Sequence, residues 1–187
     1  MGEVKIQRPV LLIAAISSRY ETAIEDWSRS TCQSTWGHVI IESELFDFDQ
    51  TSFYTRTMGN DIRKKLFAFE RLIDPGTISD YKIASNQWEE QFKLSHDYPE
   101  NRPLNIDPGY LTEAKLVLAT TKDRDHRLYL RDGIFAEVTL FYKQGVWECS
   151  RWTYPDYQSA PYHAFFDRCR EYLRNRYQSG TDDKFHP

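Results

Sequence analysis

The apolar pattern in the first half of the chain predicts three strands and two helices. Residues 9–17 form a near-continuous apolar run, which is typical of a central strand buried on both faces. Residues 20–30 and 77–92 have helical periodicity, whereas residues 38–48 and 64–73 have the pattern of strands. The first helix places apolar side chains at i, i+3, i+4 and i+7: Tyr20, Ala23, Ile24 and Trp27.

The second half of the chain is rich in short strand-like runs. Residues 115–121, 126–130, 134–142 and 146–151 are the predicted strands. Residues 162–177 carry one apolar stripe edged by charge, which predicts a C-terminal helix.

Three glycine-containing triplets are predicted turns, at residues 107–109, 131–133 and 143–145. In Asp107-Pro108-Gly109 the proline presets φ and the glycine tolerates a left-handed conformation. The other two triplets separate strand-like runs and therefore predict a β-meander of two hairpins.

This order of elements predicts an α+β fold with a ferredoxin-like βαββαβ core, whose fourth strand is residues 115–121. An antiparallel β-meander and a C-terminal helix extend that core. We expect a single α+β domain over residues 1–187, because a chain of this length can bury one sizeable core. Within it, residues 1–121 form the ferredoxin-like half, residues 122–178 the meander and helix, and residues 179–187 a polar tail.

The faces of the first hairpin indicate its register. A three-residue loop with glycine in a left-handed bulge position keeps one face nearly all apolar, which register selection favours. The resulting pairs are Leu130 with Ile134, Leu128 with Ala136, and His126 with Val138.

A loop of the same type in the second hairpin pairs Phe141 with Trp147 and Thr139 with Cys149. On that face Glu137 is expected between Arg127 and Arg151, in one row across three strands. In one interpretation the row consists of cross-strand ion pairs of small energetic value. In the other, the two guanidinium groups bind a phosphate or carboxylate while Glu137 holds them in place.

Composition narrows the range of partners. The net charge is −4, the isoelectric point is about 5.8 and no basic block stands out, so duplex nucleic acid is not an expected partner. Aromatic residues make up 15% of the chain, which fits core packing and leaves open a short single strand stacked on rings.

The cysteines and the N-terminal region predict a cytoplasmic location. Cys32, Cys149 and Cys169 are scattered and form no CxxC motif, which indicates free thiols in a reducing compartment. No signal-peptide pattern is visible, and the apolar run at residues 10–16 is too short to span a membrane.

Individual side chains supply candidate chemistry, although phosphate-loop, GxGxxG and HExxH motifs are absent. The five histidines lack metal-ligand spacing, so no metal site is predicted among them. The sequence leaves the identity of any cofactor undetermined. His126 and Asp107 are candidate proton-transfer groups, and Lys115, Lys122 and Tyr110 are further candidate ligand-binding residues. Each also has a plain structural interpretation, as a core histidine, a turn cap, two solvated lysines and a core tyrosine.

Six short segments carry a family resemblance: Pro9-Val10-Leu11-Leu12, Asp107-Pro108-Gly109-Tyr110-Leu111, Lys115-Leu116-Val117-Leu118-Ala119, Thr121-Lys122-Asp123, His126-Arg127 and Trp152-Thr153-Tyr154-Pro155-Asp156-Tyr157. Through them the chain resembles a bacterial family known as domain-of-unknown-function family 4416. The resemblance covers nearly the whole chain, and that family has no assigned activity, so the resemblance implies an architecture rather than a reaction.

Two functional hypotheses follow from these observations. In the first, an enzyme or sensor handles an anionic small molecule, for example a nucleotide-like one, which Arg127 and Arg151 hold with help from Lys115 or Lys122. In the second, a non-catalytic interaction module docks a protein through an aromatic surface. A concave basic pocket is expected for the first and a flat apolar patch for the second.

Overall fold

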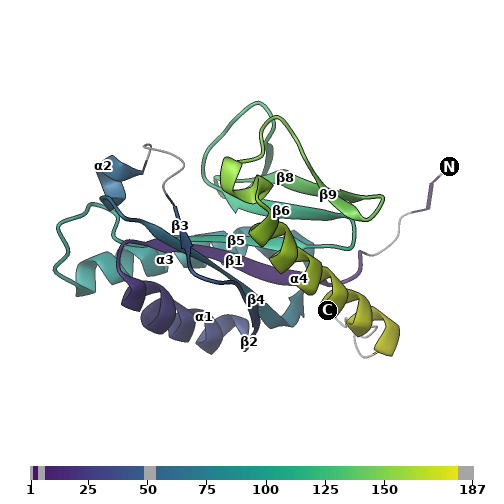
Figure 1. The fold of residues 1–187 in the computed structure, drawn as a ribbon, viewed down its shortest axis with the longest axis horizontal. Helices are drawn as coiled ribbons and strands as arrows, with labels where there is room; N and C mark the ends of the chain where they lie inside the picture. Colours follow the sequence, from purple (N-terminus) through teal and green to yellow (C-terminus); the bar gives the residue numbers. More distant parts are fainter. Residues whose placement is uncertain (1, 4–6, 49–53, 181–187) are drawn as a thin grey trace.

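One antiparallel sheet organises the chain in the computed structural model, which describes residues 2–3, 7–48 and 54–180. Within those residues the strand order is β2-β4-β1-β5-β6-β8-β7, with β3 paired to β4 and β9 paired to β8 (Figure 1). The strands are β1 (Val10–Ser18), β2 (Val39–Glu42), β3 (Phe46–Asp47), β4 (Arg63–Ile73), β5 (Asn105–Leu111), β6 (Lys115–Thr120), β7 (Leu128–Arg131), β8 (Ile134–Lys143) and β9 (Val146–Cys149).

Helical segments lie between some of these strands and after the last one. They are η1 (Ala23–Ser28), α1 (Arg29–Trp36), α2 (Thr55–Met58), η2 (Pro75–Thr77), α3 (Ile78–Ser95), η3 (Pro155–Gln158) and α4 (Ala160–Ser179). The mixed helix and strand content, the antiparallel sheet and the C-terminal helix agree with the predicted α+β class. Parts of the predicted lead-in, of the loop at 49–60 and of the polar tail lie outside the described residues.

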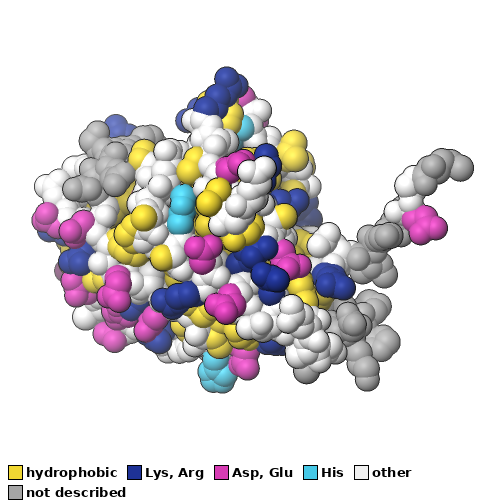
Figure 2. Space-filling model, turned by 45° about the vertical axis from the view of Figure 1, so that its right-hand side comes forward, with side chains coloured by type: hydrophobic (Ala, Val, Ile, Leu, Met, Phe, Trp, Pro, Cys, Tyr) yellow, Lys and Arg dark blue, Asp and Glu magenta, His cyan; other side chains and the backbone are white. Residues whose placement is uncertain are grey.

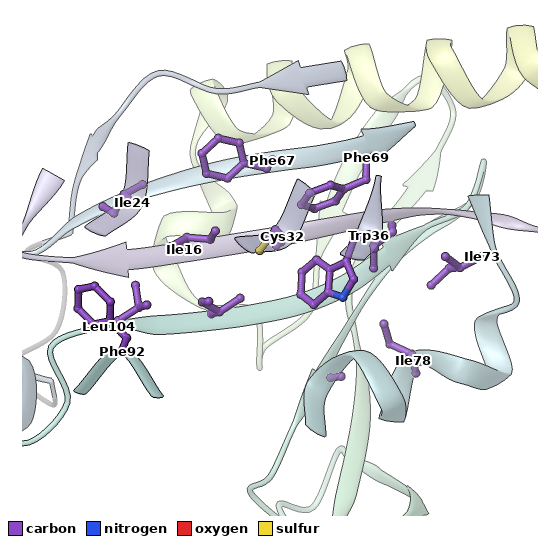
Figure 3. Packing of buried hydrophobic residues seen from close by; sticks show 14 of the residues in the cluster. Ile16, Ile24, Cys32, Trp36, Phe67, Phe69, Ile73, Ile78, Phe92 and Leu104 are labelled. Atoms are coloured by element: carbon purple, nitrogen blue, oxygen red, sulfur yellow. The ribbon is translucent and has the colours of Figure 1, made fainter. Parts of the chain in front are cut away.

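Strand β1 is buried on both faces, as its continuous apolar run predicted. Alternate side chains of β1 belong to two separate clusters, because successive residues of a strand point to opposite faces. One cluster packs the sheet against α1 and α3 through Trp36, Phe69 and Phe92 (Figure 3). The other packs it against α4 through Phe165 and Phe166.

Several predicted boundaries change because tertiary contacts outweigh local composition. The first helical region continues through α1 to Trp36, since Cys32 and Trp36 pack into the core although the segment around them is polar. The predicted strand 38–48 is interrupted, with β2 and β3 pairing to β4 separately. Helix α3 ends at Ser95, three residues beyond its predicted end.

The predicted turn at Asp107-Pro108-Gly109 is wrong, because these residues lie inside strand β5 and pair with β1. Strand β5 pairs with β6 only over Gly109–Leu111, so the two strands diverge on the N-terminal side of Gly109. A Cβ atom at Gly109 would lie 2.4 Å from the carbonyl oxygen of Val117, so only glycine allows the close approach where the strands meet.

The meander has two-residue turns in place of the predicted three-residue loops. Asp132-Gly133 and Gln144-Gly145 all have positive φ, the pattern of type I′ hairpins. In the first hairpin a bulge before Arg131 restores the predicted pairing of Leu128 with Ala136, while Arg131 replaces Leu130 opposite Ile134. The second hairpin is shifted by one residue and pairs Trp147 with Tyr142 rather than with Phe141.

Candidate functional site

A cavity of about 70 Å³ lies where β5 and β6 diverge, and side chains of the sheet, of α3 and of several loops line it. About 10–15 Å³ of such space is enough for one water molecule, so the cavity accommodates several waters or one small polyatomic ion. Its charged lining consists of five cations, Lys64, Lys82, Arg102, Lys122 and Arg127, and two carboxylates, Asp107 and Glu137. The other lining side chains with polar or aromatic groups are Asn105, Thr120, Thr121, Phe48, Tyr54, Tyr154 and Tyr157.

Helix α3 provides hydrogen-bond partners for the backbone of β5 where β6 does not pair with it. Lys82 Nζ donates to the carbonyl oxygen of Ile106 at 2.9 Å, and the Ile106 N–H donates to Glu89 Oε1 at 2.8 Å. Pro108 follows on the same edge, because alternate residues of a strand present their peptide groups to the same side. Proline has no backbone N–H, so no unpaired donor arises where β5 lacks a neighbouring strand.

The carboxylate of Asp107 accepts hydrogen bonds from two side chains beside this edge of β5. It accepts from Lys82 Nζ at 2.9 Å and from Asn105 Nδ2 at 2.7 Å. Burial raises the pKa of Asp107, but the charges of Lys82 and Arg102 and these hydrogen bonds together hold it below its usual range. Asp107 is consequently a carboxylate rather than a carboxylic acid near neutral pH.

The opposite wall of the cavity is organised by Arg127. Its Nε donates to Glu137 Oε2 at 2.6 Å, its Nη1 donates to the carbonyl oxygen of Lys122 at 2.9 Å, and its Nη2 donates to the Tyr154 hydroxyl at 2.9 Å. One guanidinium group thereby ties strand β8 to the loops that follow β6 and β9.

Lys122 lies within the electrostatic influence of three other cations and of Asp107. Burial lowers the pKa of its ammonium group, and the charges of Arg102, Arg127 and Lys82 lower it further against the opposing effect of Asp107. Its Nζ lies 5.4 Å from the ring centroid of Tyr54. Burial is therefore the main cause of this pKa shift, and the neighbouring cations add to it.

Lys64 connects the cavity to the segment before α4. Its Nζ donates to Asp156 Oδ2 at 2.7 Å, and both side chains are only 8% exposed. The same ammonium lies 3.6 Å from the ring centroid of Phe48, which is a cation–π contact.

The molecular face shown in Figure 2 carries Lys and Arg side chains interspersed with Asp and Glu rather than a block of one sign.

The structure brings four of the eight proposed site residues together in the cavity: Asp107, Lys122, Arg127 and Glu137. The predicted contact between Arg127 and Glu137 is present. Glu137 and Leu128 also lie on opposite faces, as predicted, because Leu128 pairs with the neighbouring Ala136.

The other four proposed residues lie elsewhere. His126 does not face away from Glu137 as predicted, since a turn at residues 124–127 brings its Nε2 within 2.9 Å of Glu137 Oε2, behind the cavity wall. Its ring stacks on Trp152 at 4.7 Å. Arg151 is exposed beyond the end of β9 and lies over Trp152 rather than beside Glu137, so the predicted three-residue row is wrong.

Lys115 and Tyr110 line a separate open groove near Arg8 and Tyr177. Strand β6 separates Lys115 from Lys122, because the first residue begins the strand and the second follows its end. Sequence proximity within one motif-rich stretch therefore did not imply proximity in space.

Sequence reasoning missed Lys64, Lys82, Arg102, Tyr54 and Tyr154 as cavity residues. A usable signal existed for Lys82, which follows Ile78 by four residues and so occupies the apolar stripe of α3. Lys64 likewise stands at the buried start of an apolar strand. Arg102 and the two tyrosines stand outside regular elements or at their ends, and only the tertiary structure places them.

The described residues contain no group of three or more His, Cys, Asp or Glu side chains that could hold a metal ion. Across the same residues, no helix combines the length and apolar character needed to cross a bilayer. Comparison with curated proteins and with solved structures found no match to this chain. A family model described as Domain of unknown function (DUF4416) matches residues 8–172, and the chain therefore belongs to that family.

Proposed function

We propose that the protein binds the phosphate or carboxylate group of an anionic small molecule in the cavity between β5 and β6. The observation that carries this proposal is the convergence of five cationic side chains on a space of about 70 Å³ that only two carboxylates line. Ammonium and guanidinium groups at such a site are charge-assisted donors to anionic oxygens.

The energetics of burial support a ligand. Taking a charged group out of water costs several kcal/mol, even when part of that cost is offset by a partner. Lys82 pairs with Asp107, Lys64 with Asp156, Arg102 with Glu89 and Arg127 with Glu137. Burial is the main cause that lowers the pKa of the Lys122 ammonium group, and the charges of Arg102, Arg127 and Lys82 lower it further. An anion bound beside Lys122 favours the charged form of that group.

We assign the cavity a role in binding, and we assign the two candidate proton-transfer residues positioning roles. Asp107 is a weak base because its pKa is held low, so its role is to position Lys82 and Asn105. His126 reaches the cavity only through Glu137, and we assign it to the orientation of that carboxylate.

Lysine substitutions at the two ends of β6 provide a matched test. Lys122→Gln removes a cation from the cavity wall, whereas Lys115→Gln removes an exposed one at the other end of the strand. We expect phosphate, sulfate or malonate to raise the melting temperature of the wild-type protein more than chloride does at equal ionic strength. Lys122→Gln should lose most of this difference and Lys115→Gln should keep it.

Equal responses of the wild-type protein to these anions and to chloride would reject the proposal. The same result would favour the second candidate, an interaction module. Its support is the edge strand β7, where Leu128 and Tyr129 are 74% and 61% exposed and Leu130 is also exposed. This apolar edge lies apart from the aromatic side chains of the cavity.

We further infer that the core is a ferredoxin-like βαββαβ unit within one domain. The support is the order β2-β4-β1-β5, with neighbouring strands antiparallel and helices following β1 and β4. In this assignment β5, rather than residues 115–121, is the fourth strand. The free thiols of Cys32, Cys149 and Cys169 support the proposed cytoplasmic location.

A further inference from the structure

The size of the cavity limits which part of a ligand it encloses. A space of about 70 Å³ accommodates an anionic head group, and the remainder of any larger molecule must lie at the mouth. The side chains at the mouth therefore indicate the chemistry of the rest of the ligand. This inference rests on the proposed function and names the ligand class for the same cavity.

Two tyrosines from separate loops line the cavity and contact its cations. The hydroxyl of Tyr154 accepts from Arg127 Nη2 at 2.9 Å, so the guanidinium fixes the position of the phenol. Tyr54 lies just before α2, with its ring centroid 5.4 Å from Lys122 Nζ. Each ring is thus held next to a cation that faces the head group.

Tyr154 is a large aromatic side chain that remains 38% exposed although its hydroxyl is bonded to a buried arginine. An aromatic side chain that stays partly exposed gains less free energy from apolar burial than a buried one. It does provide a rigid surface on which a planar group can stack. Tyr154 and Tyr54 line the same cavity as Lys122 and Arg127, so their rings are within reach of a group attached to an anion bound there.

We propose that the ligand is a phosphate monoester that carries a planar aromatic group, of the nucleoside monophosphate class. The phosphate occupies the cationic cavity and the planar ring stacks at the mouth on Tyr154 or Tyr54. Aromatic stacking tolerates any base, so the structure points to this class rather than to one base.

Calorimetric titration with four probes tests this inference. We expect AMP to bind the wild-type protein about tenfold or more tightly than ribose 5-phosphate, the effect of one base stacked on an aromatic side chain. Inorganic phosphate should bind no more tightly than ribose 5-phosphate, and adenosine should bind much more weakly than AMP.

Substitutions of tyrosine then locate the stacking surface. Tyr154→Phe keeps the ring and should retain the ratio between AMP and ribose 5-phosphate, whereas Tyr154→Leu should reduce it several-fold. Tyr129→Leu, on the exposed edge strand β7, is the matched control and should leave the ratio unchanged. If Tyr154→Leu keeps the full ratio, the same substitution at Tyr54 must reduce it, or the stacking surface is not at this mouth.

The possible failures are distinguishable. Equal affinity of the wild-type protein for AMP and ribose 5-phosphate overturns the planar-group inference and leaves anion binding intact. Absence of binding by AMP, ribose 5-phosphate, phosphate, sulfate and malonate overturns both proposals together.

Discussion

Asp107 shows how a single residue can be identified correctly as part of a site while its local conformation is misjudged. Its position before Pro-Gly predicted a turn cap, but the side chain instead joins Lys82 and Asn105 in the wall of the cavity. Long-range contacts with α3, which no local pattern encodes, give the carboxylate its lowered pKa.

The lowered pKa of Asp107 predicts a specific pH dependence of stability. Between the folded and unfolded pKa values the unfolded chain binds the extra proton, so the free energy of unfolding rises with pH in that interval. The contribution of Asp107 is complete above its unfolded pKa of about 3.9 and is lost as the pH falls through the lower folded value. The free energy of unfolding can be measured with urea at a series of pH values below 4. It should rise less steeply with pH for Asp107→Asn than for the wild-type protein.

Asp123→Asn, at an exposed position after β6, is a control that should keep the wild-type slope. Identical slopes for wild type and Asp107→Asn would mean that Asp107 is not held ionised by its partners.

At the scale of elements, strand β5 shows how a turn-like sequence can serve inside a sheet. Gly109 lies at the point where β5 and β6 meet, and Pro108 lies on the edge that β6 leaves open. Lys82 and Glu89 of α3 supply the hydrogen bonds that a strand neighbour would otherwise make to Ile106. The turn prediction failed because proline and glycine are favoured both in turns and at such a divergence.

Gly109→Ala should destabilise the protein, because the new methyl group meets the backbone of Val117 and the Cδ2 atom of Leu118. Overpacking of this kind costs about 1–3 kcal/mol, measurable as a lower midpoint in urea unfolding. Gly76→Ala is the matched control, since its methyl group meets only the end of the Asp74 side chain, and it should cost much less. Equal effects of the two substitutions would contradict the close approach at Gly109.

At the scale of the whole molecule, the site depends on segments that are distant in sequence. The ion pair between Lys64 of β4 and Asp156 of η3 joins the early part of the sheet to the segment that leads into α4. Arg127 joins the loops after β6 and β9 to β8. These contacts form only when the complete sheet and the meander are both in place.

The buried Lys64–Asp156 pair should be sensitive to the loss of one partner. Asp156→Ala leaves a buried ammonium group without its carboxylate and should cost about 3–5 kcal/mol in the free energy of unfolding. The double substitution Lys64→Met and Asp156→Leu removes both charges and should recover much of that loss.

The exposed pair Lys143–Glu148 is the matched control, and Glu148→Ala should cost less than about 1 kcal/mol. Similar losses for Asp156→Ala and Glu148→Ala, without recovery in the double variant, would show that the buried pair is not a structural tie.

The sequence by itself determined the features that depend on local periodicity and turn chemistry. These include the buried strand β1, helices α3 and α4, the two hairpins and the opposite facing of Leu128 and Glu137. They follow from side-chain spacing, because a helix and a strand repeat their faces with fixed and different periods.

Only the tertiary structure decided the site. The gathering of Lys64, Lys82 and Arg102 with Lys122 and Arg127 joins β4, α3 and two loops, the one before β5 and the one after β6. Arg151 is displaced from that group by a one-residue shift in a hairpin, and Lys115 by the length of β6. Tyr110 is three residues from Asp107 on β5 and therefore lies on the opposite face of the strand. A change of one residue in strand register reverses the face of every side chain, and no local pattern encodes which distant charges then meet.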